Sequence, residues 1–308
     1  MAAAPAQPYY TAIGVASALV AAVAFSGKAI LVKLAYRYSV DAVTLLTLRM
    51  VFSVPFFLAA AAWSMNDSRT ANLNARDWAA VIVLGLLGYY LGSLFDFMGL
   101  IYIPANLERV ILFLYPTLVV ILSALLLRRR ISGRELPALA LSYIGIILVF
   151  VHNIPLSQDN LALGAGLVFG SALTYALYLI GSGETIAKIG AARFTAYSMT
   201  VASIAIIVQF GFAHAREGLQ LDAFNLPLPV YVLAMAMALF STVLPAFLVS
   251  EGLRRIGAGK TAIIGAVGPV STLALSALFL DEQISALQLL GTGLVITGVL
   301  WVSLRKTV

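Results

Sequence analysis

Residues 254–265 read RRIGAGKTAIIG and contain the Gly-Lys-Thr that closes a phosphate-binding loop. Such a loop needs the pattern G-x-x-x-x-G-K-[ST] after a strand, because its backbone amides wrap the phosphates. Arg254 stands at the position of the first glycine, and Lys260 opens a long apolar run. We therefore expect no nucleotide site here and place Lys260 at the start of a helix near the lipid headgroups.

Ionisable residues also lie within apolar runs that are long enough to cross a bilayer, and charges in such runs are costly and mark functional sites by default. A rise of 1.5 Å per residue from the start of each run places all of them in the outer third of a bilayer. These residues are Lys28, Arg49, Asp96, Glu108 and Arg109.

Two interpretations fit these charges. In the first, Lys28 and Arg49 hold an anionic group of a substrate, and Asp96 holds an ammonium group or exchanges a proton. Arg109 is a further candidate for binding or for closing an outer gate, and mixed signs at one depth suit a zwitterion such as an amino acid. In the second, the charges form a structural salt-bridge cluster. Glu108 and Arg109, being adjacent, would then face different directions and extend to the outer headgroups.

Tyrosines deep in their runs are candidate cavity residues, because a tyrosine can pack and still face a wet cavity. Three of them lie too far from either surface for an interfacial aromatic belt. The alternative is ordinary helix packing. The candidates are Tyr89, Tyr90, Tyr115, Tyr175 and Tyr178.

Small and cyclic residues predict how the helices bend and pack. Pro116 and Pro269 lie in the middle of their runs, where a proline removes a backbone hydrogen bond and frees a carbonyl. We expect them to form a matched pair of hinges, or else static kinks. Gly85, Gly88 and Gly92 are expected to allow close contact between helices.

The composition sets the class of protein. The chain has 308 residues, of which 62% are hydrophobic and 10% charged, and its mean hydropathy is +1.00. Soluble domains carry about 25% charged residues, so we expect a polytopic all-α membrane protein. It has no cysteine and two histidines, which leaves no thiolate chemistry. We expect no metal, no cofactor and no catalytic centre, and the positive charge needs no nucleic-acid partner.

Ten apolar runs separated by short polar breaks predict ten transmembrane helices. The predicted spans are 11–32, 43–63, 79–101, 107–127, 136–151, 161–181, 195–213, 229–249, 259–280 and 286–303. The first run lacks the basic flank of a cleaved signal peptide and should be retained.

Basic residues set the expected orientation, because short loops rich in Lys and Arg stay cytoplasmic. With ten spans, the two ends and every second loop share one side of the membrane. That side carries Arg69, Arg76, Arg128, Arg129, Arg130, Arg134, Lys188, Arg193, Arg254, Arg255, Arg305 and Lys306. The other side carries Lys33, Arg37 and Arg216. Both termini should be cytoplasmic, in the cytoplasmic (inner) membrane.

An internal repeat appears when residues 99–148 are laid on residues 252–301 without gaps. Gly99 then falls on Gly252, Pro116 on Pro269, and the Ile-Ser at 131–132 on the Ile-Ser at 284–285. We expect two homologous halves, 1–155 and 156–308, of five spans each. Five is odd, so the halves enter the membrane from opposite sides, an arrangement common in secondary transporters with a midplane binding site.

The stretch FLDEQISALQLLGTGLVITGVLWV (279–302) resembles the closing signature of the EamA family of the drug/metabolite transporter superfamily, and YPTLVVILSALLLRRRIS (115–132) is similar to its first-half copy. Glu282 provides the acidic residue of the turn in the second half, whereas Arg129 stands at its equivalent in the first. The resemblance implies ten helices and a central cavity lined mainly by helices 1, 3, 4, 6, 8 and 9. It also implies export or exchange of small metabolites, often amino acids or related compounds.

These observations together predict a secondary transporter of a small polar or amphipathic metabolite that works by alternating access in the bilayer, with protons as a possible coupling ion. A flippase for lipids or lipid-linked intermediates is the alternative, and an integral-membrane enzyme is a weaker one.

Overall fold

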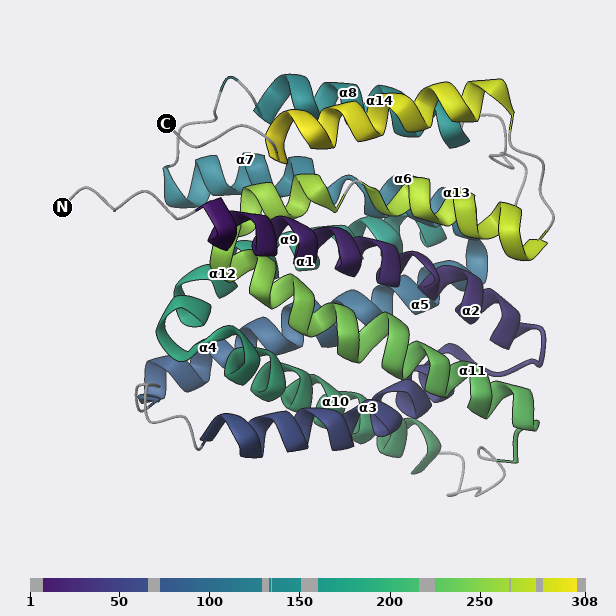
Figure 1. Ribbon diagram of the computed structural model, residues 1–308. Helices are drawn as coiled ribbons and strands as arrows, with labels where there is room; N and C mark the ends of the chain where they lie inside the picture. The colour runs from purple at the N-terminus through teal and green to yellow at the C-terminus, as the bar shows by residue number, and fades with distance from the viewer. Residues whose placement is uncertain are drawn as a thin grey trace.

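The computed structural model describes residues 8–65, 73–128, 133, 135–150, 160–215, 225–265, 267–280 and 285–303, and the regular elements in these ranges are all helical (Figure 1). The earlier elements are α1 (Pro8–Ser26), α2 (Lys28–Tyr36), α3 (Ala42–Met65), α4 (Ala75–Gly85), the π-helical segment η1 (Leu86–Leu91), α5 (Gly92–Tyr102), α6 (Ala105–Leu112), α7 (Tyr115–Leu127) and α8 (Glu135–Phe150). The later ones are α9 (Leu161–Ile189), α10 (Ala191–Ala215), α11 (Leu228–Ala238), the π-helical segment η4 (Leu239–Val243), α12 (Leu244–Ile264), α13 (Val267–Leu280) and α14 (Ala286–Ser303).

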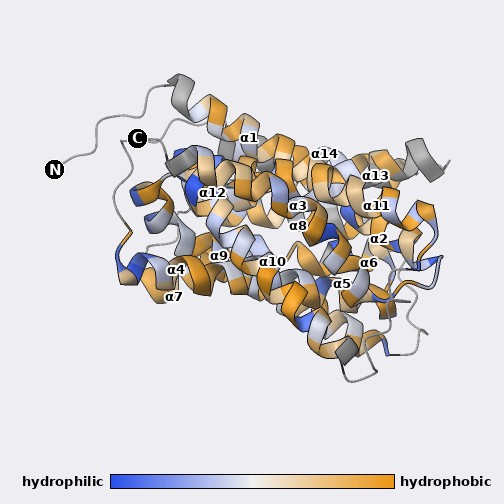
Figure 2. Ribbon diagram, turned by 90° about the horizontal axis from the view of Figure 1, so that it is seen from below, coloured by the Kyte–Doolittle hydropathy of each residue, from blue (hydrophilic) through white to orange (hydrophobic). Residues whose placement is uncertain are grey.

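Six stretches of the described chain are long and apolar enough to cross a membrane, and shorter apolar helices accompany them. The six are Thr11–Tyr36, Ala42–Trp63, Ala75–Tyr102, Leu161–Ile189, Ala191–Ala213 and Leu228–Ile264. Large apolar side chains such as Trp63, Leu125 and Phe212 are exposed on the outer surface. Figure 2 shows apolar residues along the helices and most hydrophilic residues near the two ends of the bundle. Such a surface suits a hydrocarbon environment rather than water.

The helices pack in pairs that are far apart in the sequence. α8 lies along α14 at one side of the bundle, and α3 lies along α10 at the other (Figure 1). Between these pairs, α1 packs against α12 and α5 against α9. The main hydrophobic core lies between these helices and includes Phe57, Phe97 and Tyr178.

Several chain breaks divide the longer stretches into shorter helices. Gly27 separates α1 from α2, and Phe113 and Leu114 separate α6 from α7. Inside α12, Gly257 has φ 77°, so the helical direction changes at that residue. A left-handed backbone of this kind favours glycine, which has no Cβ to clash.

The two prolines that were expected to kink continuous helices lie instead in the first turns of new ones. Pro116 is the second residue of α7, and Pro269 is the third residue of α13. A proline is well placed in a first turn, because the backbone N–H that it lacks has no partner there anyway. The break therefore comes before each proline, at the end of the preceding helix.

Close helix contact at the glycines is confirmed. A Cβ on Gly88 would lie 2.4 Å from Cγ of Tyr178 on α9, and one on Gly85 would lie 2.6 Å from the carbonyl oxygen of Ser198 on α10. The absence of side chains at these positions brings α4 and η1 against α9 and α10.

The beginning of α1, the beginning of α4 and the end of α14 lie at the same end of the bundle (Figure 1). There Lys188, at the end of α9, pairs with Asp77 of α4. Some of the residues that predict the membrane orientation, and both residues compared at the acidic turn, lie outside the described ranges. These residues are Arg69, Arg129, Arg130, Arg134, Arg216, Glu282, Arg305 and Lys306.

Candidate functional site

A cavity lies among the helices, with a volume of about 110 Å³ for the centres of water molecules. One water needs about 10–15 Å³ by this measure, so the cavity has room for several waters or for a small metabolite. Its lining comes from α1, α2, α3, η1, α5, α6, α7, α9, α10, η4 and α12. The lining includes Arg49 of α3 and Met199 of α10, from spans outside those that the family resemblance implied.

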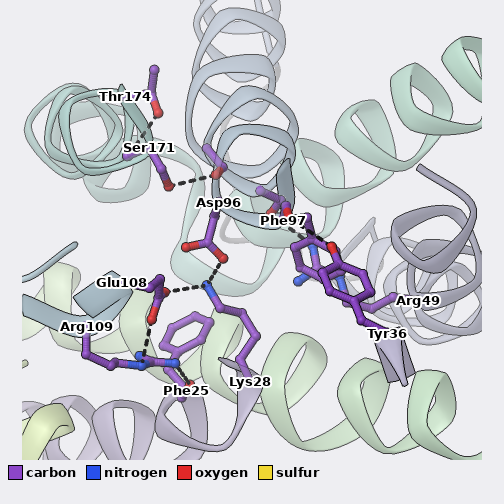
Figure 3. A network of polar contacts seen from close by, with 12 residues as sticks. Phe25, Lys28, Tyr36, Arg49, Asp96, Phe97, Glu108, Arg109, Ser171 and Thr174 are labelled. Carbon is purple, nitrogen blue, oxygen red and sulfur yellow. Dashed lines mark hydrogen bonds and ion pairs between the residues drawn. The ribbon is translucent and has the colours of Figure 1, made fainter. Parts of the chain in front are cut away.

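Four charged side chains form one connected cluster beside the cavity (Figure 3). Nζ of Lys28 lies 2.6 Å from Oδ2 of Asp96 and 3.9 Å from Oε1 of Glu108. Nε of Arg109 lies 3.1 Å from Oε2 of Glu108. The Asp96 and Glu108 side chains are 1% and 0% exposed, so the two carboxylates are shielded from water, whereas Lys28 and Arg109 line the cavity.

Three chain features bring this cluster together. Lys28 begins α2 directly after the break at Gly27, and Asp96 lies within α5. After α5 the chain turns at Ile103, which has extended backbone angles, and continues into α6. α6 packs beside α5 and against α9, so the residues that open α6 return to the level of Asp96.

Glu108 and Arg109 do not extend to the outer surface, and that expectation was wrong. Both residues are buried. Because α9 covers α6, their side chains point into the bundle. The Arg109 side chain lines the cavity, whereas Glu108 does not. The Arg109 guanidinium also pairs with the Glu108 carboxylate and donates a 3.0 Å hydrogen bond to the carbonyl oxygen of Phe25.

Arg49 lies apart from the cluster (Figure 3). Its NH2 group donates to Oγ of Ser93 at 2.9 Å, and its guanidinium carbon lies 4.8 Å from the centre of the Phe97 ring. Arg49 is 3% exposed, and its Nε has no hydrogen-bond partner among the described residues. None of the ion pairs in the described part of the chain involves Arg49.

The candidate tyrosines occupy different layers around the cavity. Tyr89, Tyr115 and Tyr175 line it. Tyr178 is fully buried behind them, and its hydroxyl lies 2.7 Å from that of Tyr89. Tyr90 is outside the lining and packs against the main core. The Tyr115 hydroxyl donates to the carbonyl oxygen of Ala262 at 3.1 Å, which connects α7 to α12.

Polar residues of the lining that were not predicted from the sequence include Ser93, Ser171 and Thr261. Ser171 donates to the carbonyl oxygen of Gly92 at 2.7 Å, and Ser93 accepts from Arg49. Ser93 precedes Asp96 by one helical turn, a spacing that places both on one face and that could have indicated it. Among the described residues, no group of three or more His, Asp and Glu is placed to hold a metal ion.

Comparisons with a family model and with related proteins agree on one transporter family. The model of the EamA-like transporter family matches residues 12–151 and 162–304. The chain is 33% identical over 291 residues to "Uncharacterized transporter YcbK" of Bacillus subtilis, covering 93% of this chain and 92% of that one. It is 28% identical over 231 residues to "Uncharacterized transporter YyaM" of the same organism, covering 74% of each. A solved structure titled "Crystal structure of protein" superposes with a TM-score of 0.73 at 15% identity over 97% of both chains, and so shares the fold.

Proposed function

This chain belongs to the EamA-like transporter family of multi-pass membrane proteins and is a transporter, not an enzyme; from that premise we propose that it exports or exchanges a small polar or amphipathic metabolite by alternating access. The proposed substrate is an amino acid or a related compound. The observation that carries the proposal is the cavity, because it is lined by charged, hydroxyl and aromatic side chains from early and late helices alike.

The proposed architecture is ten membrane passes in two inverted repeats, 1–155 and 156–308. In the first half the five proposed passes are α1 plus α2; α3; α4, η1 and α5 together; α6 plus α7; and α8. In the second half they are α9; α10; α11, η4 and α12 as far as Gly257; the rest of α12 plus α13; and α14. Six of the described stretches meet the length and hydropathy of a span, and shorter apolar helices accompany them.

Irregular backbone at corresponding places supports the repeat. When Gly99 is aligned with Gly252, the first residue of η1, Leu86, falls on the first residue of η4, Leu239. The break between α6 and α7 falls on the break between α12 and α13. π-helical segments are rare in proteins, so coincidence at one alignment is improbable.

The packing partners follow the same relation. α3 and α10 are corresponding helices and pack on each other, as do α8 and α14. The contact of α1 with α12 corresponds to the contact of α9 with α5. A pseudo-twofold axis in the membrane plane produces such pairs, and the midplane between the halves is where such transporters bind substrate.

We further propose that both termini are cytoplasmic and that the protein lies in the cytoplasmic membrane. The basic residues Lys188 and Arg193 lie at the junction of α9 and α10, and Arg254 and Arg255 precede the bend of α12. Short connections rich in Lys and Arg stay on the cytoplasmic side. If transport is proton-coupled, the cluster of Lys28, Asp96 and Glu108 is where the proton would bind.

Untargeted metabolomics of the culture medium tests this function. Cells producing the wild type are compared with cells producing Asp96→Asn and, as a control, Glu251→Gln, which changes a carboxylate outside the cavity, all at matched membrane abundance. A metabolite enriched in the medium by the wild type and the control, but not by cells lacking the protein, supports export, and its loss in Asp96→Asn supports a role for the charged cluster in transport. Identical media from all cells and from cells lacking the protein would contradict it. A change confined to outer-leaflet lipids would favour the flippase alternative.

A further inference from the structure

The cavity presents more positive than negative charge. Lys28, Arg49 and Arg109 line it, whereas Asp96 and Glu108 are not among the lining residues. The two carboxylates are used by Lys28 and Arg109. Among the described residues one cation of the lining therefore makes no ion pair, and a proton on either acid would enlarge the excess of positive charge.

Arg49 is that remaining cation, and its donors are only partly used. Its Nη2 donates a hydrogen bond to the hydroxyl oxygen of Ser93, while its buried Nε has no hydrogen-bond partner among the described residues. A buried charge without a counter-charge is unfavourable in a low-dielectric interior. The planar fork of an arginine matches the two oxygens of a carboxylate. Ser93 also lines the cavity, and since its oxygen accepts from Arg49, its own proton is free to be donated to an anion.

We propose that the substrate is a carboxylic acid with an apolar, ring-sized body and no ammonium group, and that Arg49 and Ser93 hold its carboxylate. This assignment rests on the proposed transport function and narrows its substrate class from amino acids and related compounds. It also replaces the role of Asp96 as the partner of a substrate ammonium.

The described lining offers an ammonium group no carboxylate. Asp96 and Glu108 are 1% and 0% exposed, behind the cations that they pair with. A second positive charge would lie beside Lys28, whose side chain is 12% exposed. Like charges brought together at an interface are strongly unfavourable. An acid without an amine satisfies Arg49 and avoids that repulsion.

The rest of the lining is mainly aromatic and aliphatic. Phe25, Phe113, Tyr115, Tyr175 and Leu179 contribute to it. The Tyr115 and Tyr175 rings meet edge to face at 5.2 Å, which leaves ring faces and edges for an apolar group. Most ligand pockets combine such walls with a few polar groups that orient the ligand.

Three probes of matched size separate the possibilities: 3-phenylpropionate, phenylalanine and phenethylamine. Binding of each to the full chain in lipid nanodiscs is measured from the shift of the unfolding temperature with ligand concentration. We expect 3-phenylpropionate to bind at least about tenfold more tightly than phenylalanine, a conservative figure for a like-charge contact, and phenethylamine not to bind. Phenylalanine binding equally well, phenethylamine binding, or 3-phenylpropionate failing to bind would each overturn the assignment.

Variants locate the site. Arg49→Gln should abolish binding of 3-phenylpropionate and raise the unfolding temperature of the empty protein, because it removes a buried charge that makes no ion pair with the described residues. Arg37→Gln makes the same change at an exposed position and should leave both unchanged. Ser93→Ala, a smaller change, should weaken binding if Arg49→Gln folds poorly. Unchanged binding in Arg49→Gln, or in Ser93→Ala if it must stand in, would overturn the assignment.

A final comparison separates an organic acid from a free inorganic anion. The titration is repeated in chloride and in isethionate buffers. Arg49-dependent stabilisation by chloride alone, equal to that by 3-phenylpropionate, would overturn the organic-acid assignment. Binding of 3-phenylpropionate with no transported acid in the metabolomic comparison would instead contradict the transport function and leave the anion site standing.

Discussion

The ammonium of Lys28 lies 2.6 Å from Oδ2 of Asp96, so an ion pair joins the break between α1 and α2 to the interior of α5. Lys28 also lies 3.9 Å from Glu108 on α6. The pair therefore connects three helical segments beside the cavity with one cation. The contacts of Lys28 with Asp96 and Glu108 stabilise the packing of α2, α5 and α6, and they also determine which charges face the cavity.

Removing one member of this pair should destabilise the protein strongly. Lys28→Met leaves Asp96 buried without its nearest cation, which costs about 3–5 kcal/mol in comparable buried pairs. The double variant Lys28→Met with Asp96→Asn should recover much of the loss, because no isolated charge remains. Unfolding of the two single variants and the double variant measures the coupling. A double variant as unstable as the sum of the singles would show that the pair contributes no interaction energy.

The pair of Asp77 and Lys188 should behave differently, because the Lys188 side chain is 40% exposed. Exposed ion pairs contribute about 0–1 kcal/mol and are screened by salt. Lys188→Met should therefore change the free energy of unfolding by no more than about 1 kcal/mol, and less at high ionic strength. Unfolding at low and high salt checks this. A large loss that is independent of salt would mean that the pair is effectively buried.

The sequence was sufficient to place Lys28 and Asp96 at one level, because the helical rise converts residue number into distance along each helix, and the two side chains do pair. It was not sufficient for Glu108 and Arg109, whose burial depends on the turn at Ile103 and on α9 lying over α6. These are tertiary features that a local pattern does not contain.

The different positions of Tyr89 and Tyr90 are a second feature that could not be predicted from the sequence. Adjacent helical residues face different directions, and the register of the π-helical segment η1 decides that Tyr89 lines the cavity and Tyr90 does not. Arg49 shows a third limit. Its place inside an apolar run could be read from the sequence, but the absence of an ion pair to Arg49 among the described residues follows from how Lys28 and Arg109 pair with Asp96 and Glu108.

The hydroxyl pair of Tyr89 and Tyr178 predicts a non-additive effect. Tyr178→Phe leaves the Tyr89 hydroxyl without its 2.7 Å partner in a buried place, at a cost of about 1–3 kcal/mol. Replacing both with Phe should cost less than the sum of the single changes. Stability of the four proteins in a double-mutant cycle measures this coupling. Strict additivity would mean that the hydroxyls do not interact.

Gly88 predicts a steric effect. In Gly88→Ala the new Cβ would lie 2.4 Å from Cγ of Tyr178, a fully buried ring stacked on Phe194. The ring has no room to retreat, so overpacking should cost about 1–3 kcal/mol or more. Gly166→Ala is the control, because no described atom beyond its chain neighbours and the backbone of its own helix lies within 4 Å of its Cβ position. Equal stability of the two variants would contradict the close contact between η1 and α9.

Alternating access requires that the cavity can be reached from both sides of the membrane. The chain has no cysteine, so Ser241→Cys in the lining is the only thiol of its variant, and Ile204→Cys on the outer surface of α10 is the control. Each variant is treated with a membrane-impermeant maleimide in right-side-out and inside-out vesicles. Alternating access predicts that Ser241→Cys reacts in both orientations and Ile204→Cys in neither. Reaction of Ser241→Cys in only one vesicle orientation, or in neither, would contradict alternating access through this cavity.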